Sequence, residues 1–255
     1  MIWIKENAFV LRLVPYKERD LIIEFFGENT GRFSAVLYRA RGPKESFLFQ
    51  PGDQLEVEYQ RRENQDLAKL ETSVAVKLNR GDKLSYLQFV SLSFLLELYL
   101  KIVEPEVGSN GLFDLMVGVQ SLGLDQGKPL LALLYALVQL SQFSGFGFDL
   151  GACCHCGKQT FQPGNLPKYR KQTYQLQLTG LVCADCEAPA EPLSGAAVKA
   201  MVLASTKDFL HQTPDINAET LNPAIRGLSK RLISACEIRC RSFGLLERLL
   251  LAKGV

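Results

Sequence analysis

The sequence lacks the motifs by which proteins most commonly hold nucleotides. No Gly-x-x-x-x-Gly-Lys-Ser/Thr loop occurs in its 255 residues, and no Gly-x-Gly-x-x-Gly follows a strand-like run. Only two histidines are present, His155 and His211, and the acidic residues are scattered rather than gathered as a two-metal nuclease requires. No nucleophile, base and orienting group come together. These absences predict a protein that is not an enzyme and binds no nucleotide cofactor.

Long apolar runs and a strong charge are missing as well. The most apolar segment, residues 92–103, carries Glu97 and Lys101 and falls short of a membrane span. The start, Met1–Glu6, lacks the basic and apolar regions of a signal peptide. The net charge of +2 is too small to indicate a polyanionic partner, so any such argument rests on local clusters. We therefore expect a cytoplasmic protein without a membrane segment.

Four of the seven cysteines stand in metal-ligand spacing. Cys153 and Cys156 form one Cys-x-x-Cys turn, and Cys183 and Cys186 form a second. Two such turns facing each other provide the four thiolates of a structural zinc site, predicting one Zn²⁺ per chain, and the closed shell leaves no position for a substrate. The alternatives are free buried thiols or a redox pair, and Cys154 or His155 could compete as a ligand. Cysteine in this spacing also fits a reducing compartment better than a disulfide framework.

The first third of the chain is strand-like. Short apolar or alternating runs separated by turn residues occupy positions 9–11, 21–26, 33–37, 54–59 and 67–71. Five strands in so short a stretch predict a small closed barrel, with an OB-fold as the leading candidate and an SH3-like barrel as the alternative.

Helical patterns follow the strands. Residues 84–103 are apolar on nearly every face, a second helix is expected near 112–122, and Pro129 begins a third. We assign Phe143, Phe146 and Phe148 to the core. After the cysteines, helices are expected from Ser194 to about Gln212, from Asn222-Pro223 through Cys240, and over 243–251. The predicted fold is α+β and multidomain: an OB barrel (1–80), a helical domain in two parts (81–148 and 191–255), and an inserted zinc module (149–190).

Two basic clusters suggest nucleic-acid binding. Between Thr30 and Lys44 the sequence carries four cations and no acidic residue. They are Arg32, Arg39, Arg41 and Lys44, with Phe33, Tyr38 and Phe47 as candidate base-stacking residues. A solvated hairpin face and strand aromatics packed in the core are the alternatives. The second cluster, in the zinc module, consists of Lys168, Tyr169, Arg170 and Lys171.

The order of these parts resembles the RecO family of bacterial recombination mediators. The matching motifs lie at residues 8–12 with 16–18, 30–36, 39–44, 50–55, 147–150 and 180–183. The resemblance implies an N-terminal OB-fold and a helical domain with a zinc module. It implies binding of single- and double-stranded DNA, annealing of complementary strands, and loading of RecA together with RecR and the single-strand-binding protein SSB.

The resemblance also implies a docking site for the acidic tail of SSB, which ends in phenylalanine, on the helical domain. Such a site needs an apolar pocket and a nearby cation, for which Lys230, Arg231 and Arg239 are candidates on one helix. Two other functions stay open on the residues alone: an RNA-binding accessory protein with the same barrel and zinc parts, and a Cys-x-x-Cys redox protein.

Overall fold

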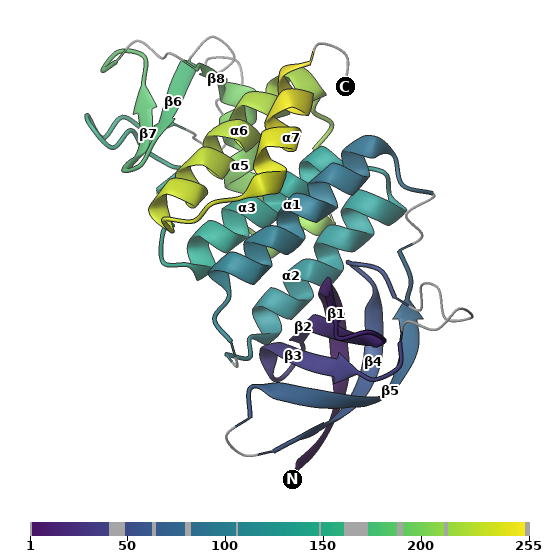
Figure 1. Cartoon of the computed structure of the whole chain (residues 1–255). Helices are drawn as coiled ribbons and strands as arrows, with labels where there is room; N and C mark the ends of the chain where they lie inside the picture. Colours follow the sequence, from purple (N-terminus) through teal and green to yellow (C-terminus); the bar gives the residue numbers. More distant parts are fainter. Residues whose placement is uncertain are drawn as a thin grey trace. The chain divides into compact units, whose positions relative to one another are not determined.

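The computed structural model of the chain consists of two compact units, Met1–Asp114 and Leu115–Val255 (Figure 1). It describes residues 2–40, 49–62, 65–79, 83–105, 107–147, 149–160, 173–187, 191–211 and 214–252. The border between the units falls inside helix α2 (Asn110–Gln120). The domain borders expected at residues 81, 149 and 191 stay predictions.

The first unit contains a closed five-stranded barrel. Its strands are β1 (Ile2–Tyr16), β2 (Asp20–Gly27), β3 (Gly31–Leu37), β4 (Gln54–Arg61) and β5 (Leu67–Lys77). The strand order around the barrel is β1-β2-β3-β5-β4, and all pairs are antiparallel except β3 with β5. A ring with this order and one parallel pair is an OB-type barrel rather than an SH3-like one. The leading sequence prediction is therefore confirmed, and the strands are longer than expected.

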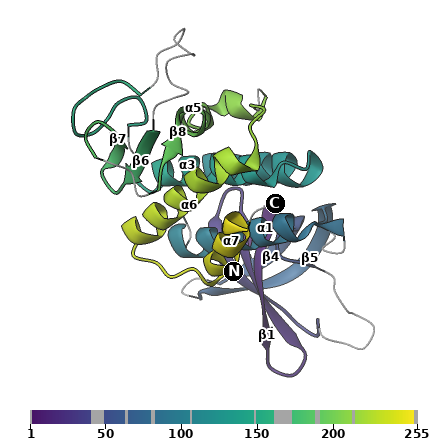
Figure 2. The same cartoon turned by 90° about the horizontal axis from the view of Figure 1, so that it is seen from above.

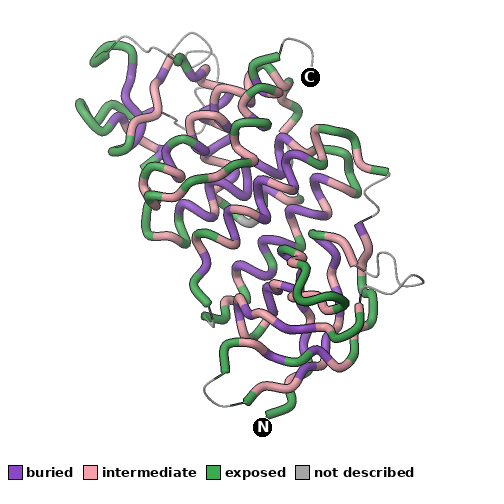
Figure 3. Tube along the Cα trace, viewed as in Figure 1, coloured by how far each residue is buried: buried purple, intermediate pink, exposed green. Residues whose placement is uncertain are grey.

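The barrel interior is filled by alternate residues of its strands. Along β4, Leu55, Val57 and Tyr59 are buried while the residues between them are partly exposed (Figure 3). At the centre, the Phe33 ring stacks on Phe25 and Tyr59, with ring centroids 5.2 and 4.4 Å apart. Such aromatic contacts add to the energy of apolar burial and fix one core arrangement.

Helix α1 (Tyr86–Ile102) belongs to the same unit. Ser85 caps it through a capping box with Gln88. On the outer face of the barrel, Tyr99 of this helix lies edge-on to Phe26, with centroids 5.2 Å apart. Ser109 accepts a hydrogen bond from the Leu112 N–H at the start of α2.

The second unit joins helices to a small sheet. Its helical elements are the last part of α2, a π-helical turn (Ser121–Asp125), α3 (Pro129–Phe143), α5 (Gly195–Ala204), a 3₁₀ turn (Lys207–Leu210), α6 (Ala218–Ala235) and α7 (Arg241–Leu251). Its sheet has the order β7-β6-β8, from β6 (Thr173–Gln177), β7 (Gly180–Cys183) and β8 (Leu193–Ser194). Helix α3, mostly buried, packs against α6 (Figure 2).

Several helix limits differ from the sequence prediction. Helix α5 ends at Ala204 instead of continuing to residue 212. Helix α6 begins earlier than Asn222-Pro223, because Asn217 caps it and Pro223 lies inside it. It also ends before Cys240, which stands at the N-cap of α7.

The prediction that Phe143 and Phe146 lie in the core is wrong, since they are 49% and 38% exposed. Phe148 lies outside the described residues. Among the residues that the structure describes, no helix has both the length and the apolar character of a membrane span.

Candidate metal centre and nucleic-acid interface

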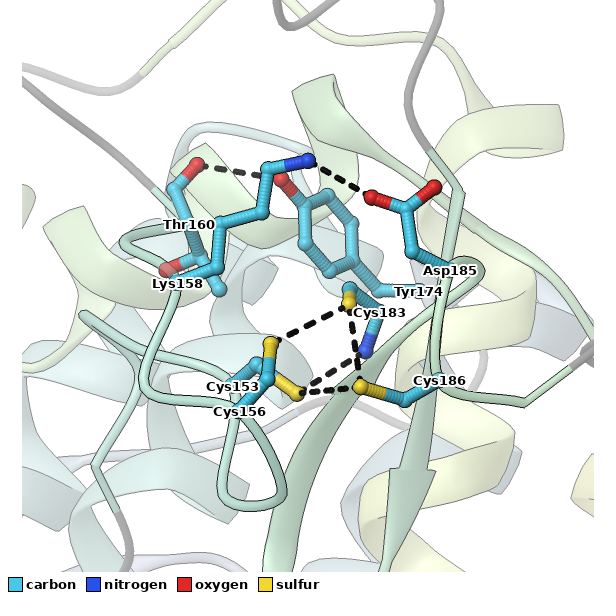
Figure 4. Close-up of polar contacts among 8 residues, drawn as sticks. All are labelled: Cys153, Cys156, Lys158, Thr160, Tyr174, Cys183, Asp185 and Cys186. Atoms are coloured by element: carbon cyan, nitrogen blue, oxygen red, sulfur yellow. Dashed lines mark hydrogen bonds and ion pairs between the residues drawn. The ribbon is translucent and has the colours of Figure 1, made fainter.

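The four predicted cysteine ligands converge on one point of the second unit. Their sulfur atoms all lie within 4.8 Å of one another (Figure 4). The sulfurs of Cys183 and Cys186 are 3.7 Å apart, as are those of Cys156 and Cys183, and the sulfurs of Cys153 and Cys186 are 3.9 Å apart. A tetrahedral zinc site with Zn–S bonds of about 2.3 Å has sulfurs about 3.8 Å apart. The thiol set therefore fits a zinc ion.

Backbone hydrogen bonds build the two turns that carry the thiols. In the first turn the Cys153 N–H donates to the Lys158 carbonyl at 2.8 Å, and Gly157 adopts a φ of +71° that closes the turn. In the second turn the Cys186 N–H donates to the Cys183 carbonyl at 3.0 Å. The Cys183 N–H reaches the Cys153 sulfur at 3.3 Å, which joins the two turns. These bonds hold the four ligands in place locally.

The thiols have very different affinities for their protons. Burial opposes ionisation of Cys153, but backbone N–H groups of Cys183, Cys156 and His155 outweigh it and lower the pKa of that thiol to about 6. Hydrogen bonding to the Cys156 and Cys183 sulfurs raises the pKa of Cys186 to about 12. The cluster therefore does not become four thiolates at neutral pH by itself, and a bound cation would supply the charge that stabilises them.

The other candidate ligands in the first turn point elsewhere. The sulfur of Cys154 lies 3.7 Å from the Thr179 hydroxyl, and Cys154 and His155 are both exposed and outside the cluster. Around the thiols, Lys158 and Asp185 form an ion pair of 2.6 Å that links the two turns (Figure 4). The Tyr174 hydroxyl donates to the Thr160 carbonyl at 3.3 Å.

One cation of the basic cluster in the barrel makes a hydrogen bond within the fold. The Nε of Arg32 donates to the Val103 carbonyl at 3.0 Å, which ties this guanidinium to the end of α1. Phe33 is only 6% exposed, and its ring is part of the barrel core. A base has no free face of this ring to stack on, so Phe33 is left out of the DNA-binding surface proposed below.

Tyr38 and Arg39 lie at the surface. Tyr38 is 51% exposed just beyond the end of β3, and Arg39 is exposed with a φ of +59°. The Arg39 N–H donates to the Asp20 carboxylate at 3.0 Å. The remaining candidates, Arg41, Lys44, Phe47 and Lys168–Lys171, lie outside the described residues.

Sequence reasoning missed residues that the barrel brings beside Tyr38. They belong to the β1–β2 turn, where Tyr16, Lys17 and Arg19 are all exposed. Strand pairing places this turn next to the end of β3, because Tyr16 pairs with Asp20 and Leu21 pairs with Leu37. The signal in the sequence was an aromatic residue with two cations at a turn, close to the expected strand 21–26.

Two family models match nearly the whole chain. The model described as Recombination protein O N terminal matches residues 1–79, and the one described as Recombination protein O C terminal matches residues 84–236. The chain belongs to the RecO family.

Several curated RecO proteins are similar to this family member at low identity. A protein of Koribacter versatilis (strain Ellin345) is 24% identical over 184 residues, which are 71% of each chain. One of Vibrio cholerae (strain M66-2) is 29% identical over 170 residues, 66% of this chain and 68% of the relative. One of Pasteurella multocida (strain Pm70) is 30% identical over 156 residues, 59% of this chain and 61% of the relative. All three are named DNA repair protein RecO.

The three cations expected on one helix of this RecO chain occupy different environments. Lys230 on α6 forms ion pairs with Glu191 at 3.4 Å and Glu247 at 3.0 Å. Arg231 is 8% exposed and donates to the carbonyls of Leu178 and Phe146, and its burial lowers the pKa of the guanidinium. Arg239 lies beyond the end of α6. The expectation of one helix is therefore wrong, and Arg231 does not present its charge at the surface.

Lys230 nevertheless lies beside an open groove in the second unit. The groove has a volume of about 420 Å³ and lies between β6, β8 and α6. Helix α6 packs closely on β6 at Gly227, where a Cβ would be in ordinary van der Waals contact with the Leu176 side chain at 3.5 Å. The apolar side chains that line the groove are Leu176, Leu178, Leu193 and Pro223.

Proposed function

We propose that this chain is a non-enzymatic, DNA-binding recombination mediator that acts in DNA repair. It would bind single- and double-stranded DNA, anneal complementary strands and, with RecR, help to load RecA onto DNA coated with SSB. The observation that carries the proposal is the match of both RecO family models, over residues 1–79 and 84–236. The name of the relatives, DNA repair protein RecO, supports the same process.

The outer face of the barrel is the proposed site for single-stranded DNA. OB barrels hold single strands with a positively charged groove and aromatic side chains. Tyr38 and Arg39 are exposed and adjacent, and Arg32, Arg41 and Lys44 are the further cations of this proposal. If about four phosphates are neutralised, affinity falls roughly fifty-fold between about 50 and 200 mM salt. Changing Arg39 and Arg41 to Ala together should flatten this dependence.

Annealing requires a second basic surface or a second chain, because two negatively charged strands must be neutralised at once. The proposed second surface is the cluster Lys168, Tyr169, Arg170 and Lys171. Base pairing supplies the free energy, so the rate should not respond to ATP. It should pass through a maximum with protein concentration, since saturating each strand separately removes the bridging.

The groove beside Lys230 is the proposed docking site for the SSB tail. Its lining includes four apolar side chains and Lys230, the kinds of group that an acidic peptide ending in phenylalanine requires, and Glu191, which also lines it, is paired with Lys230. A labelled tail peptide should show an anisotropy increase that the Leu176→Asp variant abolishes. Absence of binding at tens of micromolar peptide and low salt would remove this part of the proposal. The residues that contact RecR are not assigned.

The decisive experiment is annealing of complementary strands coated with SSB, with and without the protein. Acceleration by the wild-type chain, reduced in the Arg39→Ala/Arg41→Ala variant, is expected. Arg62→Ala is the matched control, because it removes an exposed cation just beyond β4 instead of β3. No acceleration at any protein concentration would contradict the proposal.

Two alternatives are separated by simple measurements. Matched DNA and RNA oligonucleotides distinguish a DNA mediator from an RNA-binding accessory protein, because only the latter gains from the 2′-hydroxyl. Metal analysis distinguishes a zinc centre from a redox pair. The convergence of four thiols, rather than two, favours the zinc centre.

A further inference from the structure

The outer face of strands β1, β2 and β3 ends in a row of three side chains. Tyr16 pairs with Asp20 across β1 and β2, and Leu21 pairs with Leu37 across β2 and β3. Tyr38 lies in the turn after β3, and its neighbour Arg39 donates its N–H to the Asp20 carboxylate at 3.0 Å. Laterally adjacent residues of a sheet point to the same side. Tyr16 and Tyr38 therefore lie on either side of Asp20 at this end of the three strands, and Tyr16, Asp20 and Tyr38 are called the row below.

This row faces away from the barrel core. The row before it, Pro15, Leu21 and Leu37, points toward the interior, since Leu21 and Leu37 pack against the core. Side chains alternate between the two sides of a strand, so the next row points outward. The exposed fractions agree: Tyr16 is 36% exposed and Tyr38 is 51% exposed.

The residue after each tyrosine of the row has an uncommon backbone conformation. Lys17, next to Tyr16, has a φ of 50°, and Arg39, next to Tyr38, has a φ of 59°. Residues other than glycine rarely adopt this region, and such positions concentrate at ligand sites. The Asp20 carboxylate accepts the Arg39 N–H and so fixes the second of these turns. The Lys17 ammonium lies over the Tyr16 ring, 5.1 Å from its centroid.

The charges around the row nearly cancel. Lys17, Arg19 and Arg39 are positive, whereas Glu18 and Asp20 are negative, and no other charged residue occurs between positions 16 and 20 or at 38 and 39. One net positive charge contributes little through counterion release. Ring stacking, which is tolerant of base identity, is the contribution that this surface can offer.

We propose that Tyr16 and Tyr38 are a platform on which two bases of single-stranded DNA stack. The side chains of Lys17 and Arg39 then reach the phosphates that flank these bases. This inference rests on the proposed function, because it names the residues that receive the bases at the DNA-binding barrel.

The test separates stacking from charge by the dependence of affinity on salt. Oligo(dT) binding is measured with the full chain over several salt concentrations. Tyr16→Ala and Tyr38→Ala should each weaken binding by about ten-fold without changing the salt slope. Tyr16→Phe and Tyr38→Phe should bind as the wild type does, because the ring remains. Tyr86→Ala removes a 59%-exposed tyrosine at the start of α1 and is the matched control.

A second readout follows the stacking of a base directly. An oligonucleotide carrying 2-aminopurine should change its fluorescence on binding to the wild type, because the reporter base stacks on a ring. The change should be lost in the Tyr16→Ala/Tyr38→Ala variant. A matched RNA strand shows whether the platform distinguishes the two sugars.

The outcomes distinguish this inference from the proposed function. If both alanine variants keep the affinity of the wild type while Arg39→Ala/Arg41→Ala weakens binding, the barrel binds DNA but the platform is wrong. An unchanged 2-aminopurine signal on binding also overturns the platform. If the wild type binds no single-stranded DNA at all, the proposed function itself fails.

Discussion

Different interactions stabilise the barrel and the zinc module. The barrel buries a continuous set of apolar side chains, including the stacked rings of Phe25, Phe33 and Tyr59. The described part of the module is small and buries little apolar area besides Tyr174 and the strand β7. Small units of this kind usually need a metal or disulfides for stability. We therefore expect metal removal to destabilise the module and not the barrel, and a core substitution in the barrel to destabilise the barrel and not the module.

The largest effect is expected from removing one zinc ligand. Cys183→Ser should reduce zinc from about one ion per chain to near zero, because three thiolates hold the ion far less tightly than four. Hydrogen exchange should then rise over residues 150–160 and 173–187 and stay unchanged in the barrel strands. Acidification should release the metal as well, since the ligands must lose their protons to bind it.

Cys154→Ser is the control for this variant. It changes a thiol in the first Cys-x-x-Cys turn that lies outside the cluster, so zinc content and exchange should stay at wild-type values. Full zinc occupancy in Cys183→Ser would show that another residue completes the site.

A cavity in the barrel core should destabilise the barrel and leave the zinc site intact. Phe33→Ala removes a ring that is 6% exposed and should lower the free energy of unfolding of the barrel by about 3–5 kcal/mol. Zinc content should not change. Denaturant unfolding of the barrel, followed with a metal assay on the same samples, measures both quantities. Simultaneous loss of zinc would mean that the two parts do not unfold independently.

A buried carboxylate provides a smaller, more local test of the barrel. Glu6 is 5% exposed and accepts hydrogen bonds from the Tyr59 hydroxyl at 2.8 Å and from the N–H groups of Asn29 and Thr30 at 2.8 and 3.1 Å. Glu6→Gln places an amide among these donors and should cost about 1.5–3 kcal/mol in the free energy of unfolding.

Glu28→Gln is the matched control in the nearby β2–β3 turn, because Glu28 is only partly buried and accepts a hydrogen bond from Asn7, the neighbour of Glu6. A cost for Glu28→Gln equal to that for Glu6→Gln would show that burial of the Glu6 carboxylate is unimportant.

Local patterns predicted much of this structure because their causes are local. The alternation in 54–59, the cap at Ser194 and the Cys-x-x-Cys turns each depend on neighbouring residues, and each was found where expected. The limits of α6 were missed because proline is tolerated inside a helix once the other residues favour it.

Tertiary packing explains the remaining differences at the sites. Alternation did not decide which side of β3 faces inward, so Phe33 stayed a candidate for base stacking beside the alternative of a core residue, which it is. The pairing of Leu21 with Leu37 is a long-range property of the barrel, and the sequence alone did not bring the turn at Tyr16 beside Tyr38. The burial of Arg231 likewise depends on the carbonyls of Leu178 and Phe146, far away in sequence.

The smallest effect is expected at the ion pair between the two zinc turns. Asp185 raises the pKa of Lys158 above its usual 10.5, so the pair contributes at neutral pH and is lost as the pH rises past the raised value. A comparison at pH 7 therefore measures its full contribution. Both side chains are largely exposed, at 48% and 73%, and solvent screens such pairs strongly. Asp185→Asn should leave zinc content and the melting temperature without measurable change. Loss of zinc in this variant would show that the pair, and not the thiolates alone, holds the two turns together.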